Sequence, residues 1–373
     1  MTERVRAHAP DIRAQADQIE RDRRLPPDVV RALARIGVFR LCVPRILGGE
    51  EAEPATLLAV LEELASADGS TGWCAMIGAT SGLVSAYLPE SEARAIYGAS
   101  PDVISGGVFA PTARAELQSG HYRVSGRWRF ASGCQHCDWL MGGCLVSTGG
   151  APQARMVLFP ATDAEIIDTW TVSGLRGTGS HDIAVRDLRV PATRSVSLTH
   201  DRPVAAGALY AFPLFGLLAI GIAAVALGIA RRALDEIVAL AGAKTPTAGR
   251  RTLAERSTVQ AQVAEAEAAV GAARAFLLEV VGSAWADARA HGAIEVPLRA
   301  RLRLAATHAT AASARAVDVA YTLGGGTAVY AESPLQRAFR DVHVVTQHMM
   351  VAPATWELAG RVLLGLETDT TTL

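Results

Sequence analysis

Lysine is almost absent from this chain of 373 residues. Lys244 is the single lysine, and arginine supplies the rest of the positive charge. We attribute this bias to genome composition rather than to a function specific to the guanidinium group. The 36 basic residues nearly balance the 37 acidic ones, so no net field draws the chain to nucleic acid or to an anionic membrane. Nucleic-acid binding is therefore not expected.

Cysteine is also scarce, with five residues that are odd in number and scattered through apolar sequence. This usage does not indicate a disulfide framework and is typical of reduced thiols in a cytoplasmic protein. The first residues are charged and lack the apolar core of a signal peptide. Cys134 and Cys137 flank His136, but no second pair of ligands follows at a zinc-site spacing. We expect a cytoplasmic protein without a metal site.

Charged residues are missing between Arg202 and Arg231, a run longer than a membrane span requires. The run is rich in Ala and Gly and is interrupted by Pro203 and Pro213, so its transfer into lipid is less favourable than that of a Leu-rich span. We expect a buried helix of a bundle. A membrane-associated scaffold is the alternative, and recovery in the soluble fraction without detergent would exclude it.

The apolar pattern divides the chain into three parts. Residues 1–100 show the helical spacing i, i+3, i+4, and residues 101–202 show period-two alternation with β-branched residues. Residues 203–373 are again helical, in long pieces. We predict a mainly α fold with a central β-domain and a C-terminal four-helix bundle. The expected bundle helices are 205–243, 253–291, 296–323 and 335–366.

Two segments of the β-region carry polar groups at turns. Residues 126–139 place Ser132 and a glycine between large aromatic residues, where a hydroxyl and backbone donors can meet a flat polar ring. An ordinary hairpin with core tryptophans explains this segment equally well. Residues 170–182 form a Gly-rich turn with Thr178 and Ser180, which can cradle a phosphate or the polar edge of a flavin. No helix follows this turn and the required glycine spacing is absent, so it is neither a Walker loop nor a dinucleotide motif.

A third segment, 335–348, lies on the predicted last helix. Its charged residues Arg337, Arg340 and Asp341 fall within about one turn. His343 and His348 are five residues apart and do not share a face, and we interpret His343 as a packing or surface residue.

In order, and together with residues 69–73, these segments resemble the acyl-CoA dehydrogenase fold and its branch of two-component flavin-dependent monooxygenases. That branch includes the oxygenase components of 4-hydroxyphenylacetate hydroxylase, the dibenzothiophene monooxygenase and steroid-ring hydroxylases. The resemblance implies an N-terminal helical domain, a β-barrel or sandwich and a C-terminal four-helix bundle, assembled as a homotetramer or a dimer.

The resemblance also implies roles for single residues. Ser132 would lie near flavin N5 and His348 at the reactive face of the ring. Arg250 or Arg251 would reach the cofactor phosphate across a subunit interface. The remaining expected contacts are Trp128, Thr178 and Ser180 beside the flavin, and Trp73 and Ser81 in the substrate pocket.

The implied chemistry uses reduced flavin, FMNH2 or alternatively FADH2, which a separate NAD(P)H:flavin reductase supplies. Its reaction with O2 gives a C4a-peroxide that hydroxylates a small aromatic or polycyclic substrate. Ser132 would hold the N5 proton, and His348, with a pKa close to neutrality, would deliver or retain the peroxide proton. Ser81 stands where several phenol hydroxylases of this family carry a histidine, which argues against a phenolic substrate.

The main rival is a FAD-dependent acyl-CoA dehydrogenase, which has the same fold and uses a glutamate base. Glu332 and Glu357 are the obvious carboxylates for that role. Neither stands in the Glu-Gly-Thr setting that such dehydrogenases often show, so we favour the monooxygenase.

Overall fold

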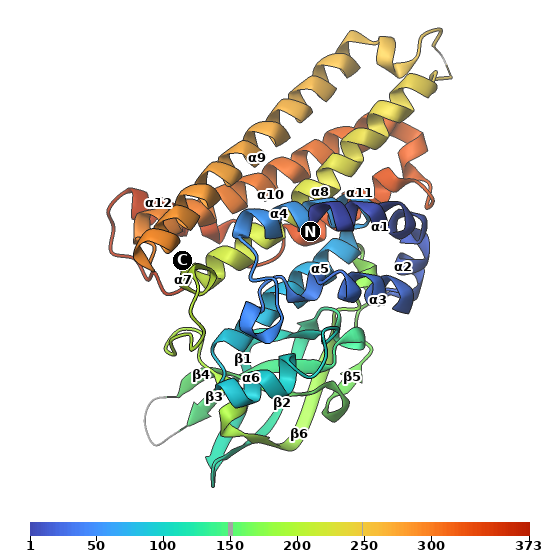
Figure 1. The fold of residues 1–373 in the computed structure, drawn as a ribbon. Coiled ribbons are helices and arrows are strands. Elements are labelled where there is room, and N and C mark those ends of the chain that lie inside the picture. The colour runs from blue at the N-terminus through green and yellow to red at the C-terminus, as the bar shows by residue number, and fades with distance from the viewer. Residues whose placement is uncertain (148–151, 248) are drawn as a thin grey trace.

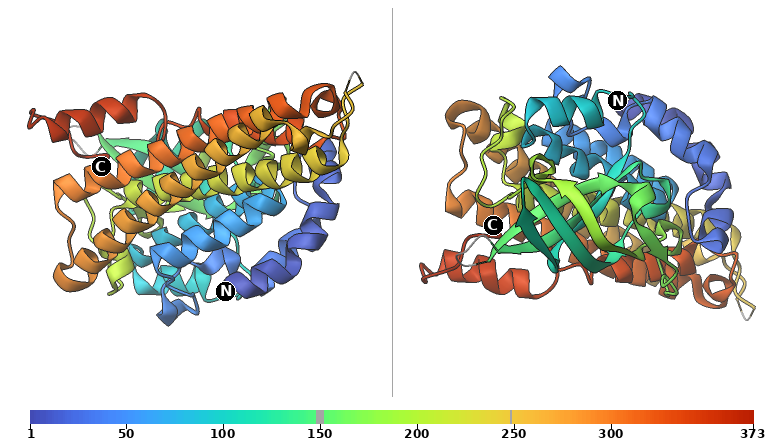
Figure 2. Two further views of the ribbon diagram at one scale, coloured as in Figure 1. Left: turned by 90° about the horizontal axis from the view of Figure 1, so that it is seen from above. Right: turned by 90° about the horizontal axis from the view of Figure 1, so that it is seen from below.

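The computed structural model describes residues 1–147, 152–247 and 249–373. Within these ranges the chain forms a helical N-terminal part, a sheet and a bundle of long helices, in that order (Figure 1). The predicted fold class is therefore confirmed. Seen from below, the strands lie in front of the helices, and seen from above, α8, α9 and α10 run side by side (Figure 2).

The N-terminal part contains short helices whose starts are marked in the sequence. Pro27 and Pro54 open two of them, since proline lacks the N–H that a first helical residue cannot use. Asp68 caps another, because its carboxylate accepts a hydrogen bond from Thr71 N at 2.7 Å. The helices are α1 Thr2–Ala14, α2 Ala16–Asp22, α3 Pro27–Arg35, α4 Pro54–Ala67, α5 Gly69–Ser81 and α6 Glu90–Tyr97.

The described strands form one mixed sheet with the order β5-β6-β2-β1-β3-β4-β7. The pair β1 and β3 is parallel, and the other neighbours are antiparallel. Inward residues of β2, β3, β4 and β6 build a separate apolar core around Trp128. The strands are β1 Ser105–Gln118, β2 His121–Ala131, β3 Trp139–Ser147, β4 Gln153–Pro160, β5 Glu165–Ile167, β6 His181–Pro191 and β7 Ser195–Val196.

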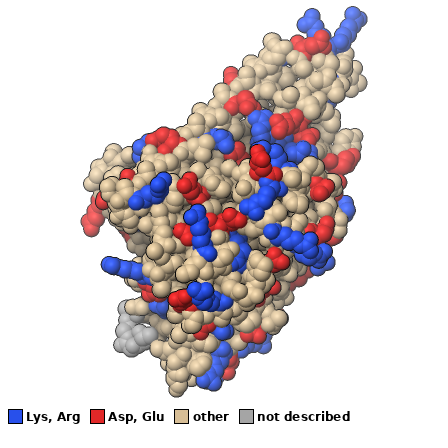
Figure 3. Space-filling view, in the orientation of Figure 1, with Lys and Arg blue, Asp and Glu red and all other residues tan. Residues whose placement is uncertain are grey.

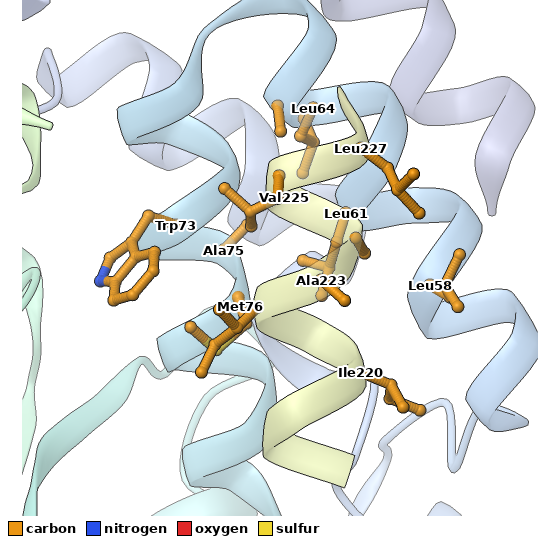
Figure 4. Close-up of a cluster of buried hydrophobic side chains, with 14 of the residues drawn as sticks. Leu58, Leu61, Leu64, Trp73, Ala75, Met76, Ile220, Ala223, Val225 and Leu227 are labelled. Carbon is orange, nitrogen blue, oxygen red and sulfur yellow. The ribbon is translucent and has the colours of Figure 1, made fainter. Parts of the chain in front are cut away.

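The C-terminal part is built around helix α8, which is apolar on nearly every face. Figure 4 shows its side chains packed against those of α4 and α5. The described helices are α7 Ala208–Ala211, α8 Leu214–Ala243, α9 Ser257–His291, α10 Val296–Gly324, α11 Pro334–Val345 and α12 Ala354–Leu363. Helices α8 and α9 are long and apolar enough to cross a membrane, but 89% of the most apolar stretch of α8 is buried inside the protein, against 33% in α9. The burial of α8 agrees with the expected buried helix. The predicted range 205–243 is divided, however, because α7 ends at Ala211 and α8 begins only after Pro213.

The predicted helix 335–366 is wrong, because the structure divides it into α11 and α12. The amide of Gln347 bonds to Val344 O and that of His348 to Val345 O, so tight turns replace the helical ladder after Val345. Pro353 then occupies the N-cap position of α12. His348 thus lies in a connecting turn.

Helix α5 lies between the bundle and the sheet. It contacts α4 and α8 on one side and β1 on the other, and it also contacts the turn Arg176–Thr178. Nearly all its side chains are therefore buried. In Figure 4, Trp73 points away from α8.

Candidate active site

Four side chains meet in a chain of hydrogen bonds at the junction of α5 and the sheet. Trp73 Nε1 donates to Ser132 Oγ at 3.0 Å, and Ser132 Oγ lies 2.7 Å from Ser180 Oγ. Ser180 Oγ lies 2.6 Å from Thr178 Oγ1, which donates to Leu175 O at 2.8 Å. Ser132, Thr178 and Ser180 are at most 5% exposed. The structure thus brings together three residues predicted for the flavin site and joins them to Trp73, which was predicted for the substrate pocket.

Tight turns place the hydroxyls at this junction. Gly133 follows Ser132 with φ +72°, and Gly179 stands between the two other hydroxyls with φ +50°, a region that favours glycine. Gly133 N donates to Thr178 O at 2.9 Å and ties the two turns to each other. The Ser-Gly and Thr-Gly-Ser patterns in the sequence are therefore backbone requirements of the site.

His348 lies on the other side of Trp73. The two ring centroids are 5.6 Å apart, with the rings edge to face. Met350 N donates to His348 Nδ1 at 3.2 Å, so the neutral imidazole carries its proton on Nε2. Burial, with a smaller effect of Arg303, lowers the pKa of His348 to about 4. The structure therefore differs from the expected pKa near neutrality, and His348 is neutral at neutral pH.

Arg303 on α10 holds the turn that contains His348. Its Nη2 donates to Met350 O at 3.1 Å and its Nη1 donates to Thr372 O. The side chain is buried, and burial lowers its pKa to about 10. Sequence reasoning missed this residue, because nothing in the sequence separates it from Arg301, which is exposed on the same helix.

Trp128 does not join the hydrogen-bonded row of Ser132, Ser180 and Thr178, which we call the hydroxyl chain. Its ring is 0% exposed, packs against Phe159 and donates from Nε1 to Gly143 O at 2.7 Å. The indole belongs to the core of the sheet, since alternation along β2 turns it inward. This arrangement argues against the predicted contact between Trp128 and a flavin.

The predicted substrate-pocket residues both lie on α5. Trp73 is near its start and touches Ser132 and His348, while Ser81 is its last residue and is buried. Glu332 and Glu357, the candidate bases of an acyl-CoA dehydrogenase, are both exposed. A base that removes a proton from an enclosed substrate should face the enclosed site, so neither glutamate suits that role.

Arg250 and Arg251 lie in the connection between α8 and α9. Figure 1 shows that this end of the two helices points away from the sheet. They line a shallow hollow with Arg256 and the start of α9. Figure 3 shows basic side chains gathered at this tip. Within one chain the structure does not bring these arginines to Ser132.

The cysteine pair makes ordinary contacts. Cys134 Sγ donates to Gly179 O and Cys137 Sγ donates to Gly133 O, and burial raises the pKa of Cys134 to about 12. Burial lowers the pKa of His136 to about 4. Among the described residues no group of three His, Cys, Asp or Glu side chains could hold a metal ion.

The residues around Ser132 fit a flavin. The hydroxyl hydrogens are used along the chain that ends at Leu175 O, so the hydroxyl oxygens offer acceptors to the polar edge of a ring system. Arg176 Nε is buried with no hydrogen-bond partner in the described ranges. Phe130 offers an aromatic face: it is 67% exposed, with φ +65°, and stands edge to face on Trp170 at 6.1 Å. A phenylalanine held at positive φ is a candidate for a functional role, because such strain is kept where the surroundings impose it.

Comparison with known proteins gives a consistent result over the whole chain. Residues 1–91 match the acyl-CoA dehydrogenase N-terminal domain and residues 220–353 match the acyl-CoA dehydrogenase C-terminal domain. The chain is 37% identical to an indole-3-acetate monooxygenase of Pseudomonas putida, over 95% of this chain and 90% of that protein. It is 34% identical to the oxygenase component of a FADH(2)-dependent resorcinol hydroxylase of Rhizobium sp. (strain MTP-10005), over 98% of this chain and 94% of that protein.

A solved structure agrees with these relatives. The HsaA monooxygenase from M. tuberculosis matches with a TM-score of 0.92 and 30% identity, over 100% of this chain and 98% of that chain. Similarity of this extent shows that the two chains share one architecture. This chain belongs to the flavin-dependent monooxygenases with the acyl-CoA dehydrogenase fold.

Proposed function

We propose that this protein is the oxygenase component of a two-component system that hydroxylates a small aromatic substrate with reduced flavin and O2. The observation that carries the proposal is the enclosed group of Trp73, Ser132 and His348, in a chain similar over nearly its whole length to aromatic hydroxylases. When bound, reduced flavin supplies the electrons that activate O2 for transfer of one oxygen atom.

The hydroxyl chain would hold the polar edge of the flavin. Trp73 occupies one acceptor position of Ser132, and Ser180 occupies another position on the same oxygen. The Ser132 hydroxyl is therefore fixed in direction rather than free to rotate. A fixed hydroxyl in a site without bulk water keeps a hydrogen bond to the cofactor during the reaction.

His348 would act on a proton at the reacting face. Its Nδ1 accepts from Met350 N, so Nε2 is left to donate to an oxygen of the substrate or of O2. Burial keeps the ring neutral by lowering its pKa. A neutral imidazole can donate a hydrogen bond without adding a buried charge.

We infer a preference for an aromatic ring that needs no deprotonation before it reacts. Ser81 is buried at the end of α5 and offers no imidazole that could remove a phenolic proton. The indole-3-acetate monooxygenase relative acts, by its name, on an indole. We therefore expect indole-type rings to be better substrates than phenols.

The proposal includes two kinds of partner. A separate NAD(P)H:flavin reductase supplies the reduced flavin, as the two-component organisation requires. Copies of this chain form a homotetramer or a dimer through the bundle, where α9 leaves much apolar surface uncovered and the α12 end exposes Leu363 and Leu364. In such an assembly Arg250 or Arg251 and the start of α9 would meet the flavin phosphate bound by another copy. The five unpaired cysteines suit a cytoplasmic location.

Rapid mixing of the protein and FMNH2, or FADH2, with O2 tests the function. We expect oxidation of reduced flavin to be coupled to hydroxylation when indole-3-acetate is present, with resorcinol a poorer substrate. The rival activity has its own assay, anaerobic reduction of bound FAD by an acyl-CoA. Reduction by the acyl-CoA, or flavin oxidation that yields only hydrogen peroxide with every aromatic acid and phenol offered, would contradict the proposal.

A further inference from the structure

Two side chains of helix α11 bind the backbone of residues 173–175, a turn that precedes Thr178 of the hydroxyl chain. Asp341 Oδ1 accepts a hydrogen bond from Leu175 N at 2.6 Å, across 166 positions of sequence. Its neighbour Arg340 donates from Nη1 to Ser173 O at 2.5 Å. Two successive residues of one helix therefore bind the backbone on both sides of Gly174.

The turn also touches the backbone of α11. A Cβ at Gly174 would lie 2.2 Å from Arg340 O and 2.7 Å from Asp341 N, so only glycine permits this approach. Leu175 then takes φ +48°, which a leucine rarely adopts. A strained residue keeps its conformation only where its surroundings hold it, and here Asp341 holds its amide.

The strained residue is directly connected to the site. Leu175 O accepts from Thr178 Oγ1 at 2.8 Å and from Trp170 Nε1 at 3.0 Å. Thr178 continues through Ser180 to Ser132. Leu175 therefore joins α11, through its N–H, to the hydroxyl chain, through its C=O.

We propose that Asp341 and Arg340 are positioning residues of the flavin site, which hold the turn Ser173–Leu175 and thereby set the place of Thr178, Ser180 and Ser132. The proposal rests on the proposed function only in taking the hydroxyl chain as the part that meets the flavin. Neither residue needs to touch the cofactor.

The other contacts of α11 provide a matched control. Arg340 and Arg337 both pair with Glu20 of α2, at 2.5 Å and 2.8 Å. Arg340 alone of the two also binds the turn. Arg340→Gln therefore removes an ion pair and the turn contact, whereas Arg337→Gln removes ion pairs and leaves the turn contact in place.

The experiment measures two quantities in the full-length protein. These are the dissociation constants for FMN and FAD, from quenching of flavin fluorescence, and the rate of hydrogen exchange at the Leu175 amide. We expect Asp341→Ala to weaken flavin binding about tenfold and to speed exchange at Leu175. Asp341→Asn keeps an oxygen that can accept from Leu175 N, so it should restore both quantities to within about threefold of the wild type.

A second pair of variants covers the case in which Asp341→Ala does not fold. Gly174→Ala pushes the turn away from α11 without changing the buried carboxyl, and it should weaken flavin binding in the same way. Arg340→Gln should weaken binding more than Arg337→Gln. In a Thr178→Val background, where the link to Ser180 is cut, the additional effect of Arg340→Gln should disappear.

The outcomes separate this proposal from the proposed function. If the wild type binds neither FMN nor FAD, oxidised or reduced, the proposed function fails. If the wild type binds flavin but Gly174→Ala and Arg340→Gln bind it equally well, the positioning role is wrong and the function stands. Equal losses in Arg340→Gln and Arg337→Gln would likewise overturn it, because the ion pairs to α2 would then explain the effect.

Discussion

The indole of Trp73 donates its Nε1 hydrogen to Ser132 Oγ at 3.0 Å, and the same ring stands edge to face with His348 at 5.6 Å. One side chain of α5 therefore joins the sheet to the turn that follows α11. Because these three groups contact one another, the effects of substitutions at them should not be additive.

Ser132→Ala should uncouple the reaction. The variant loses a hydroxyl that is hydrogen-bonded to both Trp73 and Ser180, and we expect the yield of hydroxylated product per reduced flavin oxidised to fall about tenfold, with hydrogen peroxide in its place. Ser85→Ala is the control, since that buried hydroxyl bonds only to Gly82 O. An unchanged product yield in Ser132→Ala would remove the hydroxyl from the mechanism.

Trp73→Phe tests the hydrogen bond of Trp73 Nε1 apart from the contact that its ring makes with His348. Phenylalanine keeps an aromatic ring beside His348 but leaves Ser132 without the Nε1 hydrogen. We expect a loss of about 1–2 kcal/mol in the free energy of unfolding, measured with urea, and weaker flavin binding. If stability falls while the flavin dissociation constant stays the same, Trp73 serves the fold alone.

His348 should make the protein more stable as pH rises from about 4 to 6.5. Its pKa is about 4 in the folded protein, below the ordinary value of 6.5, so the unfolded chain binds more protons in this range. The stability is fully present above pH 6.5 and is lost as pH falls through 4. His348→Gln should reduce the change in the free energy of unfolding between pH 4 and 6.5 by on the order of 1–3 kcal/mol, measured by urea unfolding across the range.

His343→Gln serves as the control for that series. His343 pairs with Asp318 at the surface, and its side chain is 42% exposed. The same flattening in both variants would show that the acid dependence does not arise at His348.

Arg303→Met should raise the pKa of His348. The positive charge of Arg303 adds to the effect of burial on the imidazole, and methionine removes the charge while it fills a similar volume. An NMR titration of the His348 ring protons would measure the shift. We also expect a loss of about 1–3 kcal/mol in stability, because Met350 O and Thr372 O lose their donor. A pKa that stays at its wild-type value would show that burial alone sets it.

Asp341 should make the protein less stable as pH rises, which is opposite to the effect of His348. Burial raises the pKa of its carboxyl to about 7, above the ordinary 3.8, so the folded protein holds the proton more tightly than the unfolded chain. This contribution is fully present below pH 3.8 and is lost as pH rises through 7. Asp341→Asn has no proton to lose, so its stability relative to the wild type should increase between pH 5 and about pH 8. A constant difference across that range would contradict the raised pKa.

Much of the fold was predictable from local patterns. The period-two alternation in residues 101–202 predicted the β-domain, where all the described strands lie. The uncharged run between Arg202 and Arg231 predicted a buried helix, which appears as α8. The last helix was predicted as one piece because its apolar spacing continues past residue 345. Pro353, which lies inside the predicted range, is a local signal for the break, since proline has no N–H to continue the helical ladder. The bond of Arg303 to Met350 O is a tertiary contact of the same segment.

The residue types of the site are visible in the sequence: the tryptophan of α5, the Ser-Gly and Thr-Gly-Ser turns and the histidine near the C-terminal helices follow one another along the chain. Which of these residues meet depends on the tertiary structure. It joined Ser132 to Trp73 and Ser180, placed Trp128 in the sheet core, neutralised His348 by burial and gave Asp341 a hold on the turn at Leu175. These outcomes depend on contacts between residues 15 to 166 positions apart, and on loss of water around charged groups, which no local pattern encodes.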